Sequence, residues 1–304
     1  MTDAQKITNL TVPRGVVDAV LDTDTYNEID DQFALAYFLS APERIRPLAI
    51  YAAPFHNSRS SGPADGMERS YAEIERILPL MGRTDIPYFR GADAYLPSEK
   101  EPVPSPAAED LVRLAREHGV ENPLYVVAIG AITNVASALL MAPEIKDNIV
   151  VVWLGGQGLD FTDSKEFNML QDIAAARVVF SSGAPLVQLP CRGVVEAFSV
   201  CGPELRYWLV DKNPLADYLA RAVLEYMKDR ENTPWTKPLW DVAAVAWLLN
   251  DGDRFMHTRL IPTPMPEYSG HYAHTPKAPL MRYAYQIRRD ALMTDLFRRL
   301  LDRE

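Results

Sequence analysis

The feature that most constrains the fold is a short apolar run, 16–22, that leads into four clustered aspartates, Asp22, Asp24, Asp30 and Asp31. The run is typical of a strand buried on both faces, because its apolar residues hardly alternate with polar ones. Two unit charges about 4 Å apart repel by roughly 4 kcal/mol at an effective dielectric of 20, so such a cluster favours a bound cation. Hard oxygen ligands suit Ca²⁺ or Mg²⁺. The stretch therefore predicts a divalent metal site at the C-terminal end of the first strand.

A plainer interpretation is an acidic loop that begins a helix. Acidic residues are favourable at the N-terminus of a helix, which we predict for 31–40. This interpretation explains the two later aspartates but not the two earlier ones. An EF-hand is excluded, because its sixth position would be Asn27 rather than Gly and its twelfth Phe33 rather than Glu.

The composition limits the class of protein. With 304 residues, of which 48% are hydrophobic, the chain can bury the core of one large α/β domain or two ordinary ones. A net charge of −10 argues against a nucleic-acid partner. Two cysteines, Cys191 and Cys201, do not make a disulfide framework. We find neither a membrane-spanning run nor a signal-peptide core, so we expect a cytoplasmic protein without a membrane partner.

Strands and helices alternate up to residue 191, which predicts a parallel sheet with right-handed crossovers. The fold class we expect is therefore α/β, with an open, mostly parallel sheet flanked by helices. The predicted strands after the first are 46–54, 86–91, 124–130, 148–156 and 184–191. The predicted helices after 31–40 are 67–81, 107–118, 131–143 and 172–183, the last with Asp172 as its N-cap.

The last third of the chain has a different pattern. Residues 203–250 are mainly helical in pattern, 251–285 have weak periodicity, and 285–303 predict a closing helix. The polar N-terminal segment, 1–14, is expected to fray. Because no internal repeat or linker is evident, we favour a single domain over residues 1–304.

Polar residues also follow the later predicted strands. The carboxyl ends of parallel strands meet at one edge of a sheet, so these groups can converge on one crevice. They are His56 and Asn57 in the loop 55–66, Thr133 and Asn134 after 124–130, Glu166, Phe167 and Asn168 after 148–156, and Asp241 at the start of a late helix.

These motifs, taken together and in this order, resemble the nucleoside N-ribohydrolases, the inosine/uridine-preferring nucleoside hydrolases. The resemblance rests on DTDTYNEIDD, AIGAITNVA, the EFN triplet and the late Asp241, and it spans residue 16 to about residue 250. It implies a Rossmann-like core with a largely helical C-terminal portion. It also implies hydrolysis of the N-glycosidic bond of a ribonucleoside or related ribosyl compound, giving ribose and free base, by an enzyme that forms a dimer or tetramer.

The resemblance further implies a role for individual residues. Asp24, Asp31, the backbone carbonyl of Thr133 and Asp241 would bind Ca²⁺, and Asp24 would act as general base on a metal-bound water. Asp22 would support the loop. Attack by this water would invert the anomeric centre, through an oxocarbenium-like state that acidic groups favour. The residues that would contact the substrate are Asp30, Asn57, Glu166, Asn168, Trp240 and Asp241.

The sequence departs from the family pattern at three places. Five residues, 25–29, separate Asp24 from Asp30, where the family has three. An Asn upstream of EFN is replaced, with Asp160 as the candidate. Trp240 stands where many members have a His that protonates the leaving base.

Trp240 can stack on a nucleobase or simply pack in the core. In its place, the leaving base could receive its proton from a polar aromatic segment, YSGHYAHTP. The candidates there are His271, His274, Tyr268 and Tyr272.

Two other functions fit part of the pattern. The DTDT run also suits a haloacid-dehalogenase-like phosphatase, with Asp22 as nucleophile and Asp24 as acid/base beside Mg²⁺, although no later Lys and aspartate pair matches. A non-catalytic nucleoside- or ribose-binding protein on the same scaffold is the other alternative, because Trp240 cannot supply the proton that the family's His does.

Overall fold

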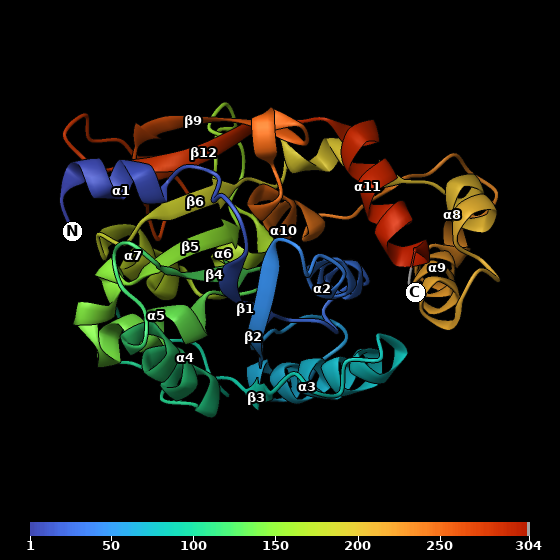
Figure 1. Cartoon of the computed structure of the whole chain (residues 1–304), viewed down its shortest axis with the longest axis horizontal. Helices are drawn as coiled ribbons and strands as arrows, with labels where there is room; N and C mark the ends of the chain where they lie inside the picture. The colour runs from blue at the N-terminus through green and yellow to red at the C-terminus, as the bar shows by residue number, and fades with distance from the viewer. Residues whose placement is uncertain (303–304) are drawn as a thin grey trace.

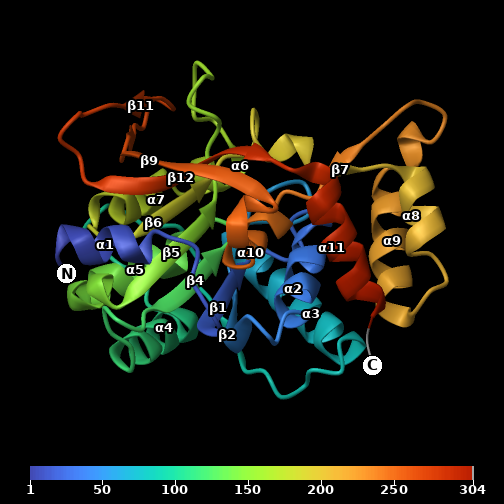
Figure 2. The same cartoon turned by 45° about the horizontal axis from the view of Figure 1, so that its top comes forward.

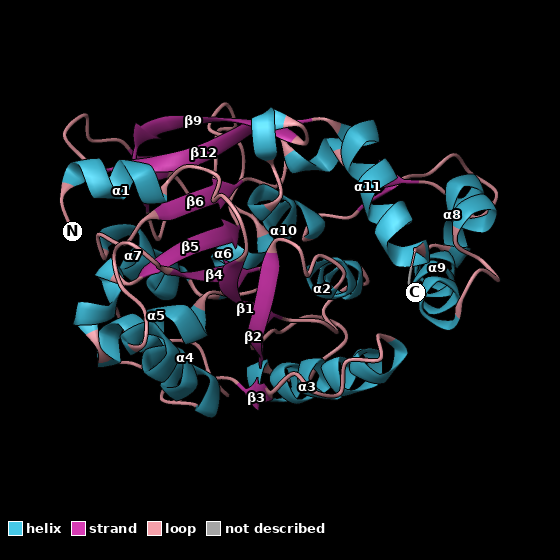
Figure 3. Ribbon diagram, in the orientation of Figure 1, coloured by secondary structure: helices cyan, strands magenta, loops and turns pink. Residues whose placement is uncertain are grey.

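The computed structural model describes residues 1–302, in which eight strands form one sheet across the molecule (Figures 1 and 3). Every neighbouring pair of strands is parallel except the last, in which β9 runs antiparallel to β12. All six predicted strands are present, so the predicted α/β fold class is confirmed. In spatial order the strands are β3 (Tyr88–Arg90), β2 (Ile45–Ala52), β1 (Val17–Thr23), β4 (Leu124–Ala128), β5 (Ile149–Leu154), β6 (Leu186–Leu189), β12 (Leu280–Ile287) and β9 (Met256–Pro262).

Helices cover both faces of this sheet (Figure 2). The α-helices are α1 (Asp3–Asn9), α2 (Asp31–Leu39), α3 (Pro63–Leu80), α4 (Pro106–Arg116), α5 (Thr133–Met141), α6 (Phe167–Gln171), α7 (Ile173–Ser181), α8 (Gly202–Trp208), α9 (Pro214–Tyr226), α10 (Val242–Leu248) and α11 (Arg289–Leu301). The short 3₁₀ helices are η1 (Pro143–Asp147), η2 (Val195–Ala197), η3 (Lys228–Arg230) and η4 (Asp251–Asp253).

The strands separate two hydrophobic cores. Along β1, Ala19 and Leu21 enter one core with α2, α3, α10 and α11, whereas Val20 enters the other with α4, α5 and α7. This alternation follows from the two-residue period of a strand, and it explains why the central strands are apolar throughout. Helix α2 is buried along its whole length, as its apolar sequence DQFALAYFL requires.

The C-terminal third differs in part from the expectation. The helical pattern of 203–250 is confirmed by α8, α9 and α10, but 251–285 contributes β9 and most of β12, and the closing helix begins only at Arg289. Strand β9 lies at the edge of the sheet and is largely half-exposed, so its sequence lacks the strong apolar pattern of a central strand. Two pairs of two-residue strands complete the fold: β7 (Ser199–Val200) with β8 (Lys237–Pro238), and β10 (Met265–Pro266) with β11 (Tyr272–Ala273).

The N-terminal segment, which we expected to fray, instead forms helix α1. Thr2 and Gln5 form a reciprocal capping box at its start. The polar residues that suggested fraying find distant partners: Lys6 donates to the carbonyl of Gly183 (3.0 Å) and Asn9 to that of Val120 (3.0 Å). Leu10, which follows the helix, is completely buried.

Two expectations from composition can be compared with the described part of the chain. Both cysteines, Cys191 and Cys201, are free. None of the helices in residues 1–302 has the length and apolar character needed to cross a membrane.

Candidate active site

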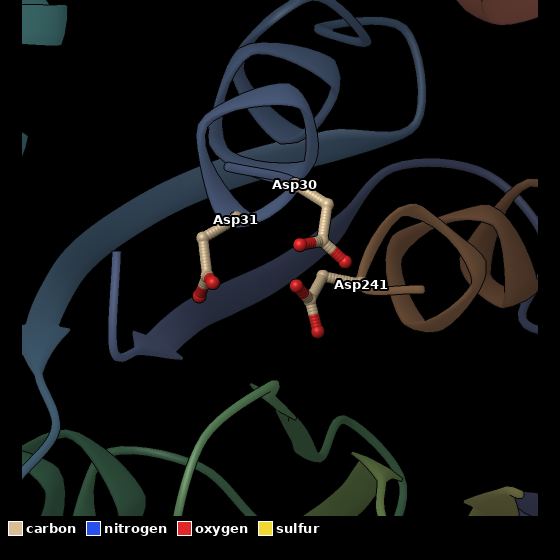
Figure 4. A group of neighbouring side chains, drawn as sticks. All are labelled: Asp30, Asp31 and Asp241. Atoms are coloured by element: carbon tan, nitrogen blue, oxygen red, sulfur yellow. The ribbon is translucent and has the colours of Figure 1, made fainter. Parts of the chain in front are cut away.

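Three carboxylates converge at the edge of the sheet where the parallel strands end. Asp30 is the N-cap and Asp31 the first residue of α2, and Asp241 is the N-cap of α10. One oxygen of each lies within 4.8 Å of the other two, and all three side chains are buried. Figure 4 shows the carboxylates pointing toward one another from the two helix starts. The predicted convergence of the first motif with the late aspartate is therefore present.

Neighbouring groups fix these carboxylates. The hydroxyl of Thr23, at the end of β1, donates to Oδ1 of Asp31 (2.6 Å), and the backbone N–H of Trp240 donates to Oδ2 of Asp30 (2.9 Å). The first N–H groups of a helix carry partial positive charge, so the starts of α2 and α10 also favour negative side chains at these places.

Asp24 and Asp22 complete the acidic cluster. Both oxygens of Asp24, and Oδ2 of Asp22, are buried without a hydrogen-bond donor anywhere in residues 1–302. The other oxygen of Asp22 accepts from Nδ2 of Asn134 (2.8 Å), which supports the role predicted for Asp22 in holding the loop. Because an unpartnered buried carboxylate costs several kcal/mol, these oxygens fit a bound cation.

Burial and mutual repulsion change the acidity of the cluster. Burial, reinforced by Asp30, raises the pKa of Asp31 to about 7. Burial and the nearby Asp31 raise the pKa of both Asp24 and Asp241 well above the usual range of a carboxyl. A divalent cation would oppose these shifts, because it favours the ionised form of each ligand. The set of hard oxygen donors fits Ca²⁺.

The predicted carbonyl ligand comes from the segment after β4. This segment passes directly beside Asp24: a Cβ atom added at Gly130 would lie 2.9 Å from Cγ of Asp24. Thr133 is the first residue of α5, and its hydroxyl donates to Oδ2 of Asp172 (2.8 Å). Its side chain is thus engaged, and the metal contact predicted for its backbone carbonyl stays a prediction.

A cavity of about 410 Å³ opens beside the carboxylates. It brings together six residues that the family resemblance assigned to substrate binding, although they come from four separate stretches of chain. They are Asp30, Asn57, Glu166, Asn168, Trp240 and Asp241.

Glu166 and Asn168 are held by the backbone at the ends of two central strands. Glu166 caps α6 and accepts hydrogen bonds from the N–H groups of Asn168 (2.9 Å), Met169 (3.0 Å) and Gly156 (2.9 Å). Burial raises the pKa of Glu166, and these three donors oppose the rise. Asn168 donates to the carbonyls of Ile129 at β4 (3.0 Å) and Leu154 at β5 (3.1 Å).

Gly156 permits the sharp turn after β5. Its φ is +77°, and a Cβ atom there would lie 2.1 Å from the hydroxyl of Tyr272. This backbone turn is what allows its N–H to reach Glu166.

Asn57 lies at the cavity wall, where its side chain ties two loops together. Nδ2 donates to Oδ1 of Asn27 (2.6 Å), in the lengthened loop 25–29, and Oδ1 accepts from the N–H of Arg59 (2.8 Å). The sugar contact predicted for Asn57 stays a prediction. His56 is exposed and does not line the cavity.

Trp240 and the segment proposed to replace the missing His lie in different places. Trp240 both packs against the core and lines the cavity. Its stacking on a nucleobase stays a prediction. His271 and His274 are exposed and lie outside the cavity lining, so the structure does not bring them to the site. The hydroxyl of Tyr272 accepts a hydrogen bond from Nε2 of Gln188 (2.9 Å), and the hydroxyl of Tyr268 donates to Oε1 of Glu99 (3.0 Å). Neither tyrosine is among the residues that line the cavity.

Sequence reasoning missed an ion pair at the cavity between a buried lysine and the half-buried Glu28. Nζ of Lys237 lies 2.5 Å from Oε2 of Glu28 and 3.6 Å from Oδ1 of Asp30, with the Lys237 side chain only 8% exposed. Although burial lowers the pKa of Lys237, Asp30 and Glu28 raise it more. The only signal in the sequence is that Glu28 lies in the lengthened loop and Lys237 shortly before Asp241. Nothing there links two residues that are 209 positions apart.

Two cavity-lining cations were also missed, Lys165 and Arg192. Each follows the carboxyl end of a predicted strand, at 148–156 and 184–191, and this position could have revealed them.

Comparisons with known proteins agree with this geometry. Residues 19–272 match the model of the inosine-uridine preferring nucleoside hydrolase family. The chain is 30% identical over 258 residues to the pyrimidine-specific ribonucleoside hydrolase RihA of Enterobacter sp. strain 638, covering 76% of this chain and 78% of that protein. It is also 30% identical over 248 residues to the protein of the same name from Escherichia coli O1:K1, covering 72% and 76%.

Solved structures share the fold. The purine-preferring ribonucleoside hydrolase from Gardnerella vaginalis superposes with a TM-score of 0.76 at 22% identity, covering 93% of this chain and 98% of that one. An inosine-guanosine nucleoside hydrolase superposes with a TM-score of 0.75 at 17% identity, covering 95% and 99%. Family and fold thus decide against the haloacid-dehalogenase-like phosphatase. With its converging aspartates, its EFN segment and a match over most of its length, this chain belongs to the inosine-uridine preferring nucleoside hydrolase family.

Proposed function

We propose that this protein hydrolyses the N-glycosidic bond of a ribonucleoside or related ribosyl compound, in a reaction that requires Ca²⁺. The observation that carries the proposal is the pair of unpartnered, buried oxygens of Asp24 beside the Asp30–Asp31–Asp241 cluster. Carboxylates placed in this way need a positive partner, and both a metal ion and a developing oxocarbenium ion supply one.

Asp24, Asp31, Asp241 and the carbonyl of Thr133 would hold the ion. Bound there, Ca²⁺ supplies Lewis acidity, which lowers the pKa of water in the site. Asp24 accepts the proton of the attacking water as general base. The new C–O bond forms at the anomeric carbon while the electron pair of the broken C–N bond goes to the base, so the anomeric centre is inverted.

Other cavity residues orient the substrate. Asp30, Glu166 and Asn168 hydrogen-bond the ribose hydroxyls, and bonds from carboxylates strengthen as positive charge develops on the ring. Glu166 is suited to this role because three backbone N–H groups fix its position. Trp240 offers its indole face for stacking on the base. No histidine lines the cavity within the described residues, so the proposal assigns no side chain to protonating the base.

The first test is release of reducing sugar from a panel of ribonucleosides, with Ca²⁺ or with a chelator. Uridine and cytidine head the panel, because the sequence relatives are named pyrimidine-specific. We expect Asp24→Asn to lower kcat about 10²–10⁴-fold, the usual contribution of a general base. Asp229→Asn, which changes an exposed carboxylate outside the cavity, is the matched control and should leave kcat unchanged.

The outcomes separate the alternatives. Sugar release that needs both Asp24 and the metal supports the hydrolase. Ribonucleoside binding without release from any substrate would instead favour the non-catalytic binding protein, which the absence of a histidine from the cavity makes the second candidate. Release that persists in Asp24→Asn or in chelator would contradict the proposed roles of Asp24 and of the metal.

A further inference from the structure

Two cations line a cavity whose proposed chemistry calls only for carboxylates. Lys165 and Arg192 are both exposed and both line the cavity with Asp30, Glu166 and Asp241. Neither charged group has a hydrogen-bond or ion-pair partner among residues 1–302. The third nearby cation, Lys237, is by contrast buried and paired with Glu28.

The proposed reaction does not explain these two charges. A ribonucleoside such as uridine is neutral, and its transition state is positive at the sugar, so cations beside it oppose the reaction. The chain as a whole has a net charge of −10, so unpaired cations that gather at this cavity are not a consequence of composition. Their position is accounted for if the substrate itself carries a negative group.

Hydrogen bonds to their backbone groups hold Lys165 and Arg192 at one side of the cavity. The buried side chain of Gln157 donates from Nε2 to the carbonyl of Lys165 (3.0 Å) and accepts at Oε1 from the N–H of Arg192 (2.9 Å). The N–H of Gly158 adds a bond to the carbonyl of Arg192 (2.9 Å). One amide side chain thus joins the loop between β5 and α6, which rises above the sheet in Figure 2, to the segment after β6.

The stem of Lys165 is also supported from behind. A Cβ atom added at Gly270 would lie 2.8 Å from its Cε, so the chain passes close against the methylene groups. Gly270 has a φ of +81°, which favours glycine at this close approach. The ammonium group therefore extends from a packed stem beside the cavity.

We propose that Lys165 and Arg192 form an anion subsite that selects ribosyl substrates bearing a negative group. This deepens, and rests on, the proposed hydrolase function. A guanidinium can bind a carboxylate or phosphate with two parallel hydrogen bonds, and an ammonium adds a third donor. The anion has two chemical sources, a phosphate on the 5′ carbon of the ribose or a carboxylate on the base, and these can be told apart with matched compounds.

The test compares substrates that differ only in the anion. Uridine 5′-phosphate is compared with uridine for the sugar arm, and 5-carboxyuridine with 5-carbamoyluridine for the base arm. In the wild type we expect kcat/KM to favour the anionic member of one pair by about ten-fold or more, as charge-assisted hydrogen bonds typically do. The pair that shows the preference identifies the source of the anion.

Charge removal tests the two residues directly. The ratio of kcat/KM between the two members of that pair should fall to about one in Lys165→Gln/Arg192→Gln. It should persist in Arg14→Gln/Lys277→Gln, which removes two charges from exposed positions outside the cavity. A ratio near one for both pairs in the wild type, or a preference that survives in Lys165→Gln/Arg192→Gln, would overturn the subsite.

Product binding keeps the test independent of turnover. Thermal shifts are compared for ribose 5-phosphate against ribose, and for uracil-5-carboxylate against uracil-5-carboxamide. If no nucleoside is hydrolysed but an anionic product binds through Lys165 and Arg192, the subsite stands and the hydrolase proposal falls. If uridine is hydrolysed and neither anionic product binds better than its neutral counterpart, the hydrolase stands and the subsite falls.

Discussion

The two sides of the cavity are built in different ways. One side, here called the floor, is the acidic cluster at the end of β1 and at the starts of α2 and α10. Asp30 and Asp241 of this cluster line the cavity, and Asp22, Asp24 and Asp31 are its other buried carboxylates. The other side, here called the rim, consists of Glu28, Lys165, Arg192 and Trp240, which are half-buried or exposed and lie outside the α-helices and the central sheet. The floor follows the family pattern, whereas Glu28 and Trp240 of the rim lie where the sequence departs from it.

The contrast between floor and rim indicates which residues determine the reaction and which determine the substrate. The position of a floor residue follows from the sheet topology, because parallel strands end at one edge. The rim residues depend on side chains that meet across long stretches of sequence, such as Lys237 with Glu28, and can change without moving the floor. We therefore expect the floor to set the reaction and the rim to set the substrate.

The largest effect on stability should come from removing Lys237, whose charge links Glu28 of the rim to Asp30 of the floor. Lys237→Met leaves Glu28 and the buried Asp30 without their cation, so we expect the free energy of unfolding to fall by about 3 kcal/mol, measured by urea denaturation. Lys237→Arg retains the charge and is the control. Glu28→Gln/Lys237→Met should recover part of the loss. A free energy for Lys237→Met equal to that of the wild type would show that floor and rim are not coupled.

An intermediate effect on stability should come from adding Ca²⁺, which we expect to bind the floor and not the rim. At 100 times its Kd, Ca²⁺ should stabilise the fold by about 2.7 kcal/mol at neutral pH. Without metal, the raised pKa of Asp31, about 7, means that the folded state binds more protons than the unfolded state. The stability that Asp31 contributes to the fold is thus fully present below its unfolded pKa of about 3.9. This stability is lost as the pH rises to about 7.

The measurement is Tm with Ca²⁺ and with chelator between pH 5 and pH 8. The Ca²⁺-dependent increase in Tm should grow with pH over this range, because the ligands must be ionised to bind. Asp31→Asn should reduce both the increase and its pH dependence. An increase that is the same at both ends of the range would contradict the raised pKa of Asp31.

The smallest effect is expected beyond the rim. His271 and His274 are exposed and lie outside the cavity, so His271→Ala/His274→Ala should change kcat/KM for the best ribonucleoside by less than about two-fold. A decrease of ten-fold or more would mean that their segment moves into the cavity during the reaction, and the boundary drawn here for the rim would be too narrow.

The sequence allowed the central sheet and most of the floor to be predicted. The strands were recognisable because a strand buried on both faces is a continuous apolar run, and Asp22, Asp24, Asp30 and Asp31 are close together in the chain. Asp241 was recognisable as the start of a late apolar helix, and its metal and substrate roles came only through the resemblance. Edge strand β9 was missed because a half-exposed strand lacks that apolar signal.

The rim could not be predicted in the same way. Gln157 joins Lys165 to Arg192 through its side-chain amide, and such a contact has no periodicity in the sequence. His271 and His274 were selected because of their chemistry alone, and residue type does not show whether a side chain reaches a cavity. Trp240 was placed correctly at the cavity, since its neighbour Asp241 fixes the start of α10.

The aspartates of the acidic cluster come from distant parts of the chain, and this has a consequence for biosynthesis. Asp30 and Asp31 leave the ribosome long before Asp241, which is more than 200 positions later in the sequence. Synthesis proceeds at about 5–20 residues per second, so the early aspartates wait on the order of ten seconds or more for their last partner. During that interval the nascent chain lacks a complete cluster. An ion held by Asp24, Asp31 and Asp241 together would therefore bind only after Asp241 has emerged.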